Sequence, residues 1–303
     1  MLRTSKAFVE YVFAKTLIWL FGSLPHPIAY LVGDIAAWVG YTVANRQRQS
    51  GMRNLQMALP HLSESKRRKI IHGVFRNLGR LLVEFSRFPK LTKENISQLV
   101  EYEGFDHYVQ AHNHGKGILY LTAHIGVWEL APFAHSVYGY PLKFLVRSID
   151  NPLIDGLITH LRTCSGNTLI RRTNATREVL KALQNNEAVG FLIDQNTTRN
   201  EGIFADFFGI PAATTPGLAT FALRTNAAVI PAYMRWDEGR RRHILHFDPP
   251  LNLVRTGDRR KDILENTKMF NRVLEDFVRQ FPEEWLWIHR RWKTRPEGEA
   301  PLY

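Results

Sequence analysis

The side chains whose types and spacing point most directly to chemistry are His124 and Glu129, in the segment Thr122-Ala123-His124-Ile125-Gly126-Val127-Trp128-Glu129. Histidine titrates near neutral pH, so it is the side chain that most often serves as a general base. A carboxylate beside the imidazole can fix its tautomer and stabilise the imidazolium that forms. We therefore predict that His124, oriented by Glu129, deprotonates an alcohol that attacks a thioester.

The spacing of this pair sets a condition on the backbone around it. On a continuous helix, residues five apart point about 140° away from each other. The apolar run at residues 117–123 predicts a buried strand that ends just before His124, and Gly126 allows a sharp bend. We therefore expect His124 on a strand-to-helix turn and Glu129 in the first turns of the helix. On these residues alone, an ordinary core or surface histidine is the alternative.

Strands and helices alternate along the rest of the chain. Residues 45–100 are predicted as helical, with Ser63 at a helix start. Thr215 and Pro216 are typical of the N-cap and the first position of a helix. Further strands are predicted at residues 142–146, 188–193, 228–236 and 243–247, and helices at residues 176–185, 215–224 and 262–281. This alternation predicts an α/β sheet with helices on its faces, in which functional residues gather where strands end.

The amino-terminal part of the chain is apolar enough to meet a membrane. Between residues 16 and 44 the only formally charged side chain is that of Asp34, and Pro25 and Pro27 divide the run into two helices, each short for a membrane span. Basic residues flank the run on both sides, which favours a monotopic anchor on the cytoplasmic face. We predict a membrane-associated helical segment at residues 1–45 and a separate domain at residues 46–303; the alternative is a pair of core helices.

The chain is strongly basic, with a formal net charge of +12 and a pI near 9.9. Eleven basic and two acidic residues lie between Arg46 and Lys90. Such a surface favours an anionic partner, whether phospholipid headgroups, a phosphorylated substrate, an acidic carrier protein or nucleic acid. No nucleic-acid-binding motif accompanies the charge, so we expect no nucleic acid partner.

Other residues that often carry chemistry do not form a recognisable site. His112 and His114 lack a third metal ligand at a familiar spacing, and Gly115-Lys116-Gly117 lacks the spacing of a nucleotide-binding loop. We therefore expect neither a metal nor another cofactor. Cys164 is the only cysteine, which excludes an intramolecular disulfide, and we expect it to be structural.

Blocks of residues along nearly the whole chain resemble the motifs of one family. The blocks are Arg53-Asn54-Leu55 before Leu59-Pro60; His124-x-x-x-x-Glu129; Val146-Arg147 with Asn151-Pro152 and Arg162; Asp194-Gln195; Phe207-Phe208-Gly209-Ile210-Pro211 with Thr214, Gly217 and Ala219; and Glu284-Trp285-Leu286-Trp287-Ile288-His289-Arg290-Arg291-Trp292-Lys293-Thr294-Arg295-Pro296. Together they resemble the lipid A biosynthesis acyltransferases, the late lauroyl and myristoyl transferases, and their lysophospholipid acyltransferase relatives. Several blocks in the same order are far more specific than any one of them.

The resemblance implies a mixed sheet flanked by helices, as in glycerolipid acyltransferases, with an acyltransferase domain at residues 46–303. It also implies that the enzyme, at the cytoplasmic face of the bacterial inner membrane, takes an acyl chain from an acyl carrier protein thioester and transfers it to an anionic lipid, a lipid A precursor. His124 is then the base and Glu129 its partner. The substrate-binding residues that it implies are Arg147, Asn151, Arg162, Asp194, Gln195, Phe208, Gly209 and Thr214.

These blocks report the shared chemistry better than they report the substrates. Another lysophospholipid, aminolipid or glycolipid acceptor, with acyl-CoA as donor, therefore stays open, as does a non-enzymatic basic membrane-binding protein. Arg147 could bind a phosphate or polarise the thioester carbonyl, and Asp194 could bind a sugar or cap a turn. The Phe-rich stretch at residues 204–210 could line an acyl channel or be plain core. The Trp- and Arg-rich end could lie at lipid headgroups or be a packed aromatic carboxyl terminus.

Overall fold

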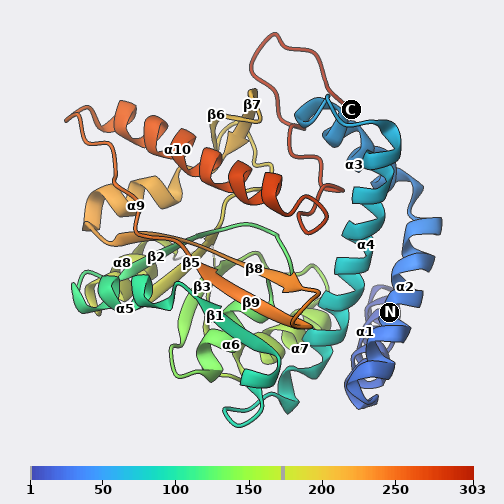
Figure 1. Ribbon diagram of the computed structural model, residues 1–303. Helices are drawn as coiled ribbons and strands as arrows, with labels where there is room; N and C mark the ends of the chain where they lie inside the picture. Colours follow the sequence, from blue (N-terminus) through green and yellow to red (C-terminus); the bar gives the residue numbers. More distant parts are fainter. Residues whose placement is uncertain (1, 172–174) are drawn as a thin grey trace.

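Seven strands form one sheet within residues 2–171 and 175–303, which are the parts of the chain that the computed structural model describes. The strand order is β1-β9-β8-β2-β5-β3-β4 (Figure 1). All neighbouring strands are parallel except β8 and β9, so the sheet is mixed, as predicted. The strands are β1 (Val100–Glu103), β2 (Ile118–Thr122), β3 (Leu142–Val146), β4 (Thr168–Arg171), β5 (Ala188–Leu192), β8 (Ala228–Asp237) and β9 (Arg242–Phe247).

Helices cover both faces of this sheet because the central strands carry apolar side chains on each face. Leu119 and Leu121 of β2 face one hydrophobic core, which includes residues of α8 (Ala175–Gln184), α9 (Gly217–Thr225) and α10 (Arg259–Gln280). Ile118 and Tyr120 face a second core with α5 (Phe105–Asn113), α6 (Leu130–Val137) and α7 (Pro152–Thr163). In Figure 1, α9 and α10 lie above the sheet and α6 lies below it. A small hairpin of β6 (Ile203–Phe207) and β7 (Ile210–Thr214) packs beside α10.

Four helices precede the sheet: α1 (Leu2–Ser23), α2 (His26–Val43), α3 (Asn45–Ala58) and α4 (Glu64–Arg87). Pro25 and Pro27 stand at the junction of α1 and α2, as predicted. The side chain of Ser63 caps α4 by accepting a hydrogen bond from the Lys66 backbone N–H, which confirms the predicted start. The helical region predicted at residues 45–100 ends earlier than expected: α4 ends at Arg87, and two 3₁₀ turns, Phe88–Lys90 and Ile96–Gln98, come before strand β1.

Glycines let α1 and α2 pack closely against α4. A Cβ atom placed on Gly33 would lie 2.8 Å from Val83 Cγ2, and one on Gly79 would lie 2.5 Å from the Gly33 carbonyl oxygen. Gly22 of α1 approaches Ser86 of α4 in the same way. The two amino-terminal helices are therefore fixed to the globular part of the protein by close backbone contacts.

The opposite sides of α1 and α2 are apolar and exposed. Twelve of the sixteen large apolar side chains that are exposed in the described chain belong to these helices: Phe8, Val9, Val12, Phe13, Trp19, Leu20, Ile28, Leu31, Ile35, Trp38, Val39 and Val43. Across residues 2–171 and 175–303, no single helix combines the length and apolar character needed to cross a bilayer. The pair α2 and α3, which meet at an angle of 84°, meets both conditions together.

The start of α9 differs from the sequence prediction. Pro216 occupies the N-cap and Gly217 begins the helix, one residue later than expected. Thr215 instead accepts a weak hydrogen bond from the Gly217 backbone N–H through its hydroxyl oxygen. The β7 strand ends at Thr214, so the chain has only two residues in which to turn from strand to helix.

His135 on α6 is a buried polar residue in the core beneath the sheet. Its side chain lies among aromatic rings, with Nδ1 2.7 Å from the Tyr102 hydroxyl and Nε2 2.9 Å from the Tyr120 hydroxyl. Only 2% of the residue is exposed, and this burial lowers the pKa of the imidazole to about 3. The ring is therefore neutral in the folded protein at neutral pH, and both nitrogens are hydrogen-bonded.

This histidine should make the fold sensitive to acid. In the unfolded chain it binds a proton below about pH 6.5, whereas in the folded chain it does not until about pH 3, so stability falls as the pH falls through this range. The expected slope from this one group is about 1.4 kcal/mol per pH unit. Chemical denaturation at pH 5, 5.5 and 6 should show a slope smaller by about this amount in His135→Gln than in the wild type; equal slopes would contradict the prediction.

Candidate active site

His124 and Asp194 are brought together by the register of two neighbouring parallel strands. Thr122 at the end of β2 pairs with Leu192 at the end of β5, so positions 124 and 194 lie side by side just beyond the sheet. The His124 Nδ1 atom is 2.8 Å from Asp194 Oδ1, and the His124 backbone N–H donates to Asp194 Oδ2 at 2.9 Å. Asp194 thus holds His124 through both its imidazole ring and its backbone N–H.

Asp194 remains ionised although it is buried. Burial by itself raises the pKa of this carboxyl, but attraction to His124 and several hydrogen bonds outweigh that effect and lower the pKa to about 2. One of these bonds comes from Trp285 Nε1–H, which donates to Asp194 Oδ2 at 2.9 Å. A carboxylate at this position accepts a hydrogen bond from His124 Nδ1–H, so the lone pair of the imidazole lies on Nε2, which can act as a base.

Glu129 was predicted to contact His124, but the carboxylate that contacts this imidazole is that of Asp194. Glu129 instead forms a two-point ion pair with Arg162, whose Nε–H donates to Glu129 Oε2 at 2.8 Å and whose Nη2 donates to Oε1. The reason lies in the loop between β2 and α6. Gly126 adopts φ 59°, and a Cβ there would lie 1.8 Å from the Met234 carbonyl oxygen, so the chain turns tightly against β8. Glu129 reaches the N-cap of α6 and faces α7.

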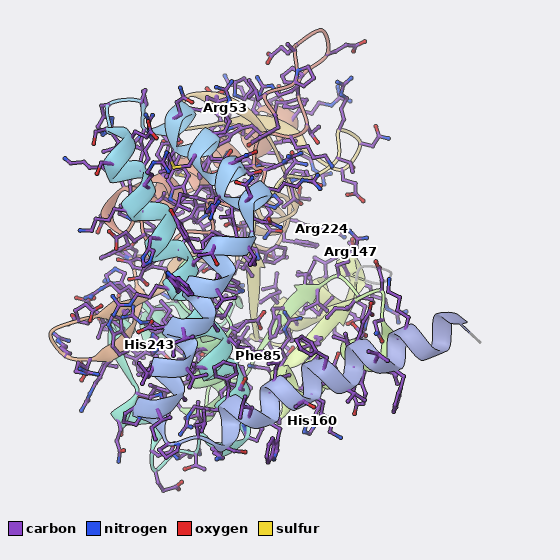
Figure 2. The ribbon with its side chains drawn as sticks, turned by 90° about the vertical axis from the view of Figure 1, so that its right-hand side faces the viewer. Arg53, Phe85, Arg147, His160, Arg224 and His243 are labelled. Atoms are coloured by element: carbon purple, nitrogen blue, oxygen red, sulfur yellow. The ribbon has the colours of Figure 1, made fainter. Side chains whose placement is uncertain are left out.

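An apolar cavity of about 390 Å³ opens beside His124. Its polar lining residues include His124, Glu129, Arg147, Arg162 and Gln195, and Arg147 lies on the exposed side (Figure 2). Its buried walls come from the lower face of the sheet and from α6, namely Tyr120, Leu142, Phe144, Ala232, Leu245 and Phe247, with His135. An apolar chain could lie along this cavity with its reacting end near His124.

The other predicted substrate-binding residues make contacts within the protein and do not line this cavity. Asn151 caps α7 and donates to the Ala7 carbonyl oxygen of α1. Thr214 is fully buried, and Phe208 and Gly209 form the turn between β6 and β7. Asn151 is suited to a helix cap and Gly209 to a positive φ, while the Phe208 ring packs near Trp287. Any contact of these residues with substrate remains a prediction. Phe207 and Phe208 are buried and do not line the cavity, which agrees with the alternative that this stretch is part of the core.

The carboxyl-terminal block supports the loop that carries Asp194. Arg291 is fully buried; its guanidinium donates to the carbonyl oxygens of Gln195 and Ala213 and to the Thr214 hydroxyl oxygen. His289 Nε2 accepts from the Asn196 backbone N–H at 3.0 Å. Trp285, Trp287 and Trp292 are also buried, so this end of the chain is packed aromatic core and not a headgroup-level surface. The support that Trp285 and Arg291 give to the loop of Asp194 was not predicted, because both residues come from a distant segment.

A histidine fixed by a buried carboxylate at the opening of an apolar cavity is suited to moving an acyl chain onto a hydroxyl. Within residues 2–171 and 175–303, no three His, Cys, Asp or Glu side chains are placed to hold a metal ion. The class of protein is that of the O-acyltransferases. The family described as bacterial lipid A biosynthesis acyltransferase matches residues 2–294, and the chain belongs to this family.

Its relatives match along most of their length. A lipid A biosynthesis acyltransferase of Haemophilus influenzae is 28% identical over 269 residues, which cover 89% of this chain and 82% of that protein. The lipid A biosynthesis palmitoleoyltransferase of Escherichia coli (strain K12) is 28% identical over 292 residues, with coverage of 96% and 93%. The lauroyltransferase of the same organism is 29% identical over 293 residues, with coverage of 95% and 92%.

Proposed function

We propose that this enzyme transfers a fatty acyl chain from an acyl carrier protein thioester to a hydroxyl of a lipid A precursor. The observation that carries the proposal is the position of His124: its Nδ1 is held by a buried carboxylate and its ring borders an apolar cavity. The family and the names of its members, which include lauroyl- and palmitoleoyltransferases, support the acceptor. The basic surface of the chain suits both an acidic carrier and a phosphorylated lipid.

The reaction follows from the arrangement of the residues around the cavity. His124 Nε2 takes the proton of the acceptor hydroxyl as its oxygen attacks the thioester carbonyl carbon. The carbon–sulfur bond of the tetrahedral intermediate then breaks, and the imidazolium returns the proton to the leaving thiolate. Asp194 stabilises the imidazolium throughout, because its carboxylate stays on Nδ1. Arg162, held by Glu129, and Arg147 are cationic side chains on the cavity lining, where they could stabilise the charge that develops on the thioester carbonyl oxygen or bind an anionic phosphate of the substrate.

We also propose that the protein works at the cytoplasmic face of the inner membrane, held there by α1 and α2. The exposed apolar side chains of these helices support this, since such a surface is stabilised by contact with acyl chains. In Figure 2, α1 runs past His160 of α7 toward the side of the molecule where Arg147 lies, so a lipid could pass from the membrane to the cavity.

Vesicle flotation tests this placement. Leu31→Glu with Trp38→Glu should reduce binding to vesicles of phosphatidylethanolamine and phosphatidylglycerol, while Val109→Glu on α5, an exposed apolar residue away from these helices, should not. Equal binding by all three proteins would refute the placement.

The enzymatic proposal is tested with purified protein, an acyl carrier protein thioester and a lipid A precursor. The wild type should form a product heavier by one acyl chain, and His124→Ala should form almost none. Mass spectrometry of lipids from cells with and without the gene provides the matching test in the cell. Altered phospholipids beside unchanged lipid A would reject the proposed acceptor, and full activity of His124→Ala would reject the proposed base.

A further inference from the structure

Gln195 covers the nitrogen of His124 that must act as the base. The Gln195 side-chain Nε2 lies 3.2 Å from His124 Nε2. Because the Nδ1 proton of His124 points to Asp194, Nε2 holds the lone pair, and the carboxamide N–H of Gln195 can donate to it. The hydroxyl of an acceptor must donate to this same lone pair, so the acceptor and Gln195 compete for one position.

The backbone on either side of Gln195 is fixed, whereas its side chain is not. Arg291 donates to the Gln195 carbonyl oxygen, and His289 accepts from the Asn196 backbone N–H. The Asn196 side chain also makes reciprocal hydrogen bonds with Thr294. Among the residues that the structure describes, the Gln195 side chain has no hydrogen bond other than the one to His124, and it borders the cavity. It can therefore rotate away without disturbing the loop that holds Asp194.

We propose that Gln195 gates the general base and protects the thioester from water. This inference rests on the proposed acyl transfer. Without an acceptor, water that donates to His124 Nε2 would add to the thioester carbonyl; the carbon–sulfur bond would break and leave a free fatty acid and a thiol. The Gln195 amide occupies the lone pair and opposes this reaction. A lipid acceptor displaces the amide, because its other contacts in the site add to the contact of its hydroxyl, whereas a water molecule has no such contacts.

The hydrogen bond need only be of ordinary strength for this effect. A net hydrogen bond of average strength corresponds to about a 2- to 12-fold change in the population of the open state. Hydrolysis of the thioester should change by the same factor when the amide is removed. Transfer should not rise in parallel, because the acceptor already displaces the amide.

The test compares thioester hydrolysis without acceptor and acyl transfer with acceptor in Gln195→Met and in the wild type. Methionine keeps the length and approximate volume of the side chain but cannot donate a hydrogen bond. We expect hydrolysis to rise about 2- to 12-fold and the ratio of transfer to hydrolysis to fall. Gln195→Asn keeps the amide on a shorter side chain that cannot reach His124, and it should behave like the methionine variant. Hydrolysis at or below the wild-type rate in both variants would overturn the gate.

A second measurement reads the gate without any acyl substrate. Diethyl pyrocarbonate acylates an imidazole nitrogen that has a free lone pair, and peptide mass spectrometry reports its rate at His124. The rate should be higher in Gln195→Met than in the wild type, whereas His114, an exposed residue between α5 and β2, should be labelled equally in both. Equal labelling of His124 would overturn the gate. Failure of the wild type to transfer any acyl chain would instead overturn the proposed function and leave the labelling result to judge the gate.

Discussion

Asp194→Asn is expected to lower kcat for acyl transfer by about 10³- to 10⁴-fold, which is the size of effect seen when the carboxylate behind a catalytic histidine becomes an amide. Asp194 accepts hydrogen bonds from the His124 backbone N–H, from the His124 ring and from Trp285. An asparagine has only one side-chain oxygen, so its NH₂ group would face one of these donors. The imidazole would then lose its tautomer or its orientation, and the imidazolium would lose its counter-charge.

The loss should be in kcat and not in the binding of the acyl donor. A binding assay with a non-hydrolysable donor analogue should therefore give a similar Kd for both proteins. Asp206→Asn makes the same chemical change at an exposed position on β6 and should leave kcat unchanged. A kcat for Asp194→Asn within tenfold of the wild type, with a folded protein, would show that His124 does not need this carboxylate.

Asp194 was not predicted as the partner of His124. The apolar runs before His124 and Asp194 were correctly predicted as strands, and both polar residues were correctly placed at strand ends. The sequence does not say, however, that β2 and β5 are neighbours, because β3 and β4 come between them in the chain. Once that adjacency is known, the pairing of Thr122 with Leu192 brings the two side chains together. Glu129 was the nearest carboxylate in sequence, and proximity in sequence was a poor guide in an irregular loop.

The fold itself was predicted well wherever a segment buries one continuous apolar stretch. Strand β3 has the predicted ends, and α8 and α10 differ from the predicted bounds by one to three residues. Helix α7 was not predicted, and neither was the hairpin of β6 and β7. Phe208 and Gly209, which have positive φ values, form the tight turn of the hairpin, and the rings of Phe207 and Phe208 pack near the carboxyl-terminal tryptophans. Strand β6 packs against α10. That partner lies far away in sequence, so the apolar residues alone left an acyl channel and plain core as alternatives.

Missing α7 also hid the partner of Glu129. Arg162 lies in the last turn of that helix, and its guanidinium reaches Glu129 across the opening of the cavity. Only 15% of the Glu129 side chain and 22% of the Arg162 side chain are exposed, so the pair is largely shielded from water. A two-point ion pair of this kind gives the guanidinium a fixed direction. We interpret Glu129 as the residue that aims Arg162 at the reacting carbonyl or at a substrate phosphate.

This interpretation predicts strongly non-additive effects at the two positions. Glu129→Gln and Arg162→Gln should each lower kcat/KM by about 10²- to 10³-fold, the loss of transition-state stabilisation expected when one donor to an oxyanion is removed or misdirected. The double variant should be almost as active as either single variant, because each change already removes the aimed guanidinium. Arg162→Lys should restore little activity, since an ammonium cannot make the two-point contact.

The alternative, in which Glu129 acts on His124 itself, predicts a different pattern. Glu129→Gln would then be non-additive with Asp194→Asn, because both would act through the imidazole, and Arg162→Gln would retain most of its activity. Under our interpretation, Glu129→Gln and Asp194→Asn act on different atoms of the reaction, so their free-energy effects should add to within about 0.5 kcal/mol, as they do for independent sites. Measuring kcat/KM at one pH for the three single variants and for the two double variants that include Glu129→Gln separates the two arrangements, because only one of them couples Glu129 to Arg162 and leaves Asp194 independent.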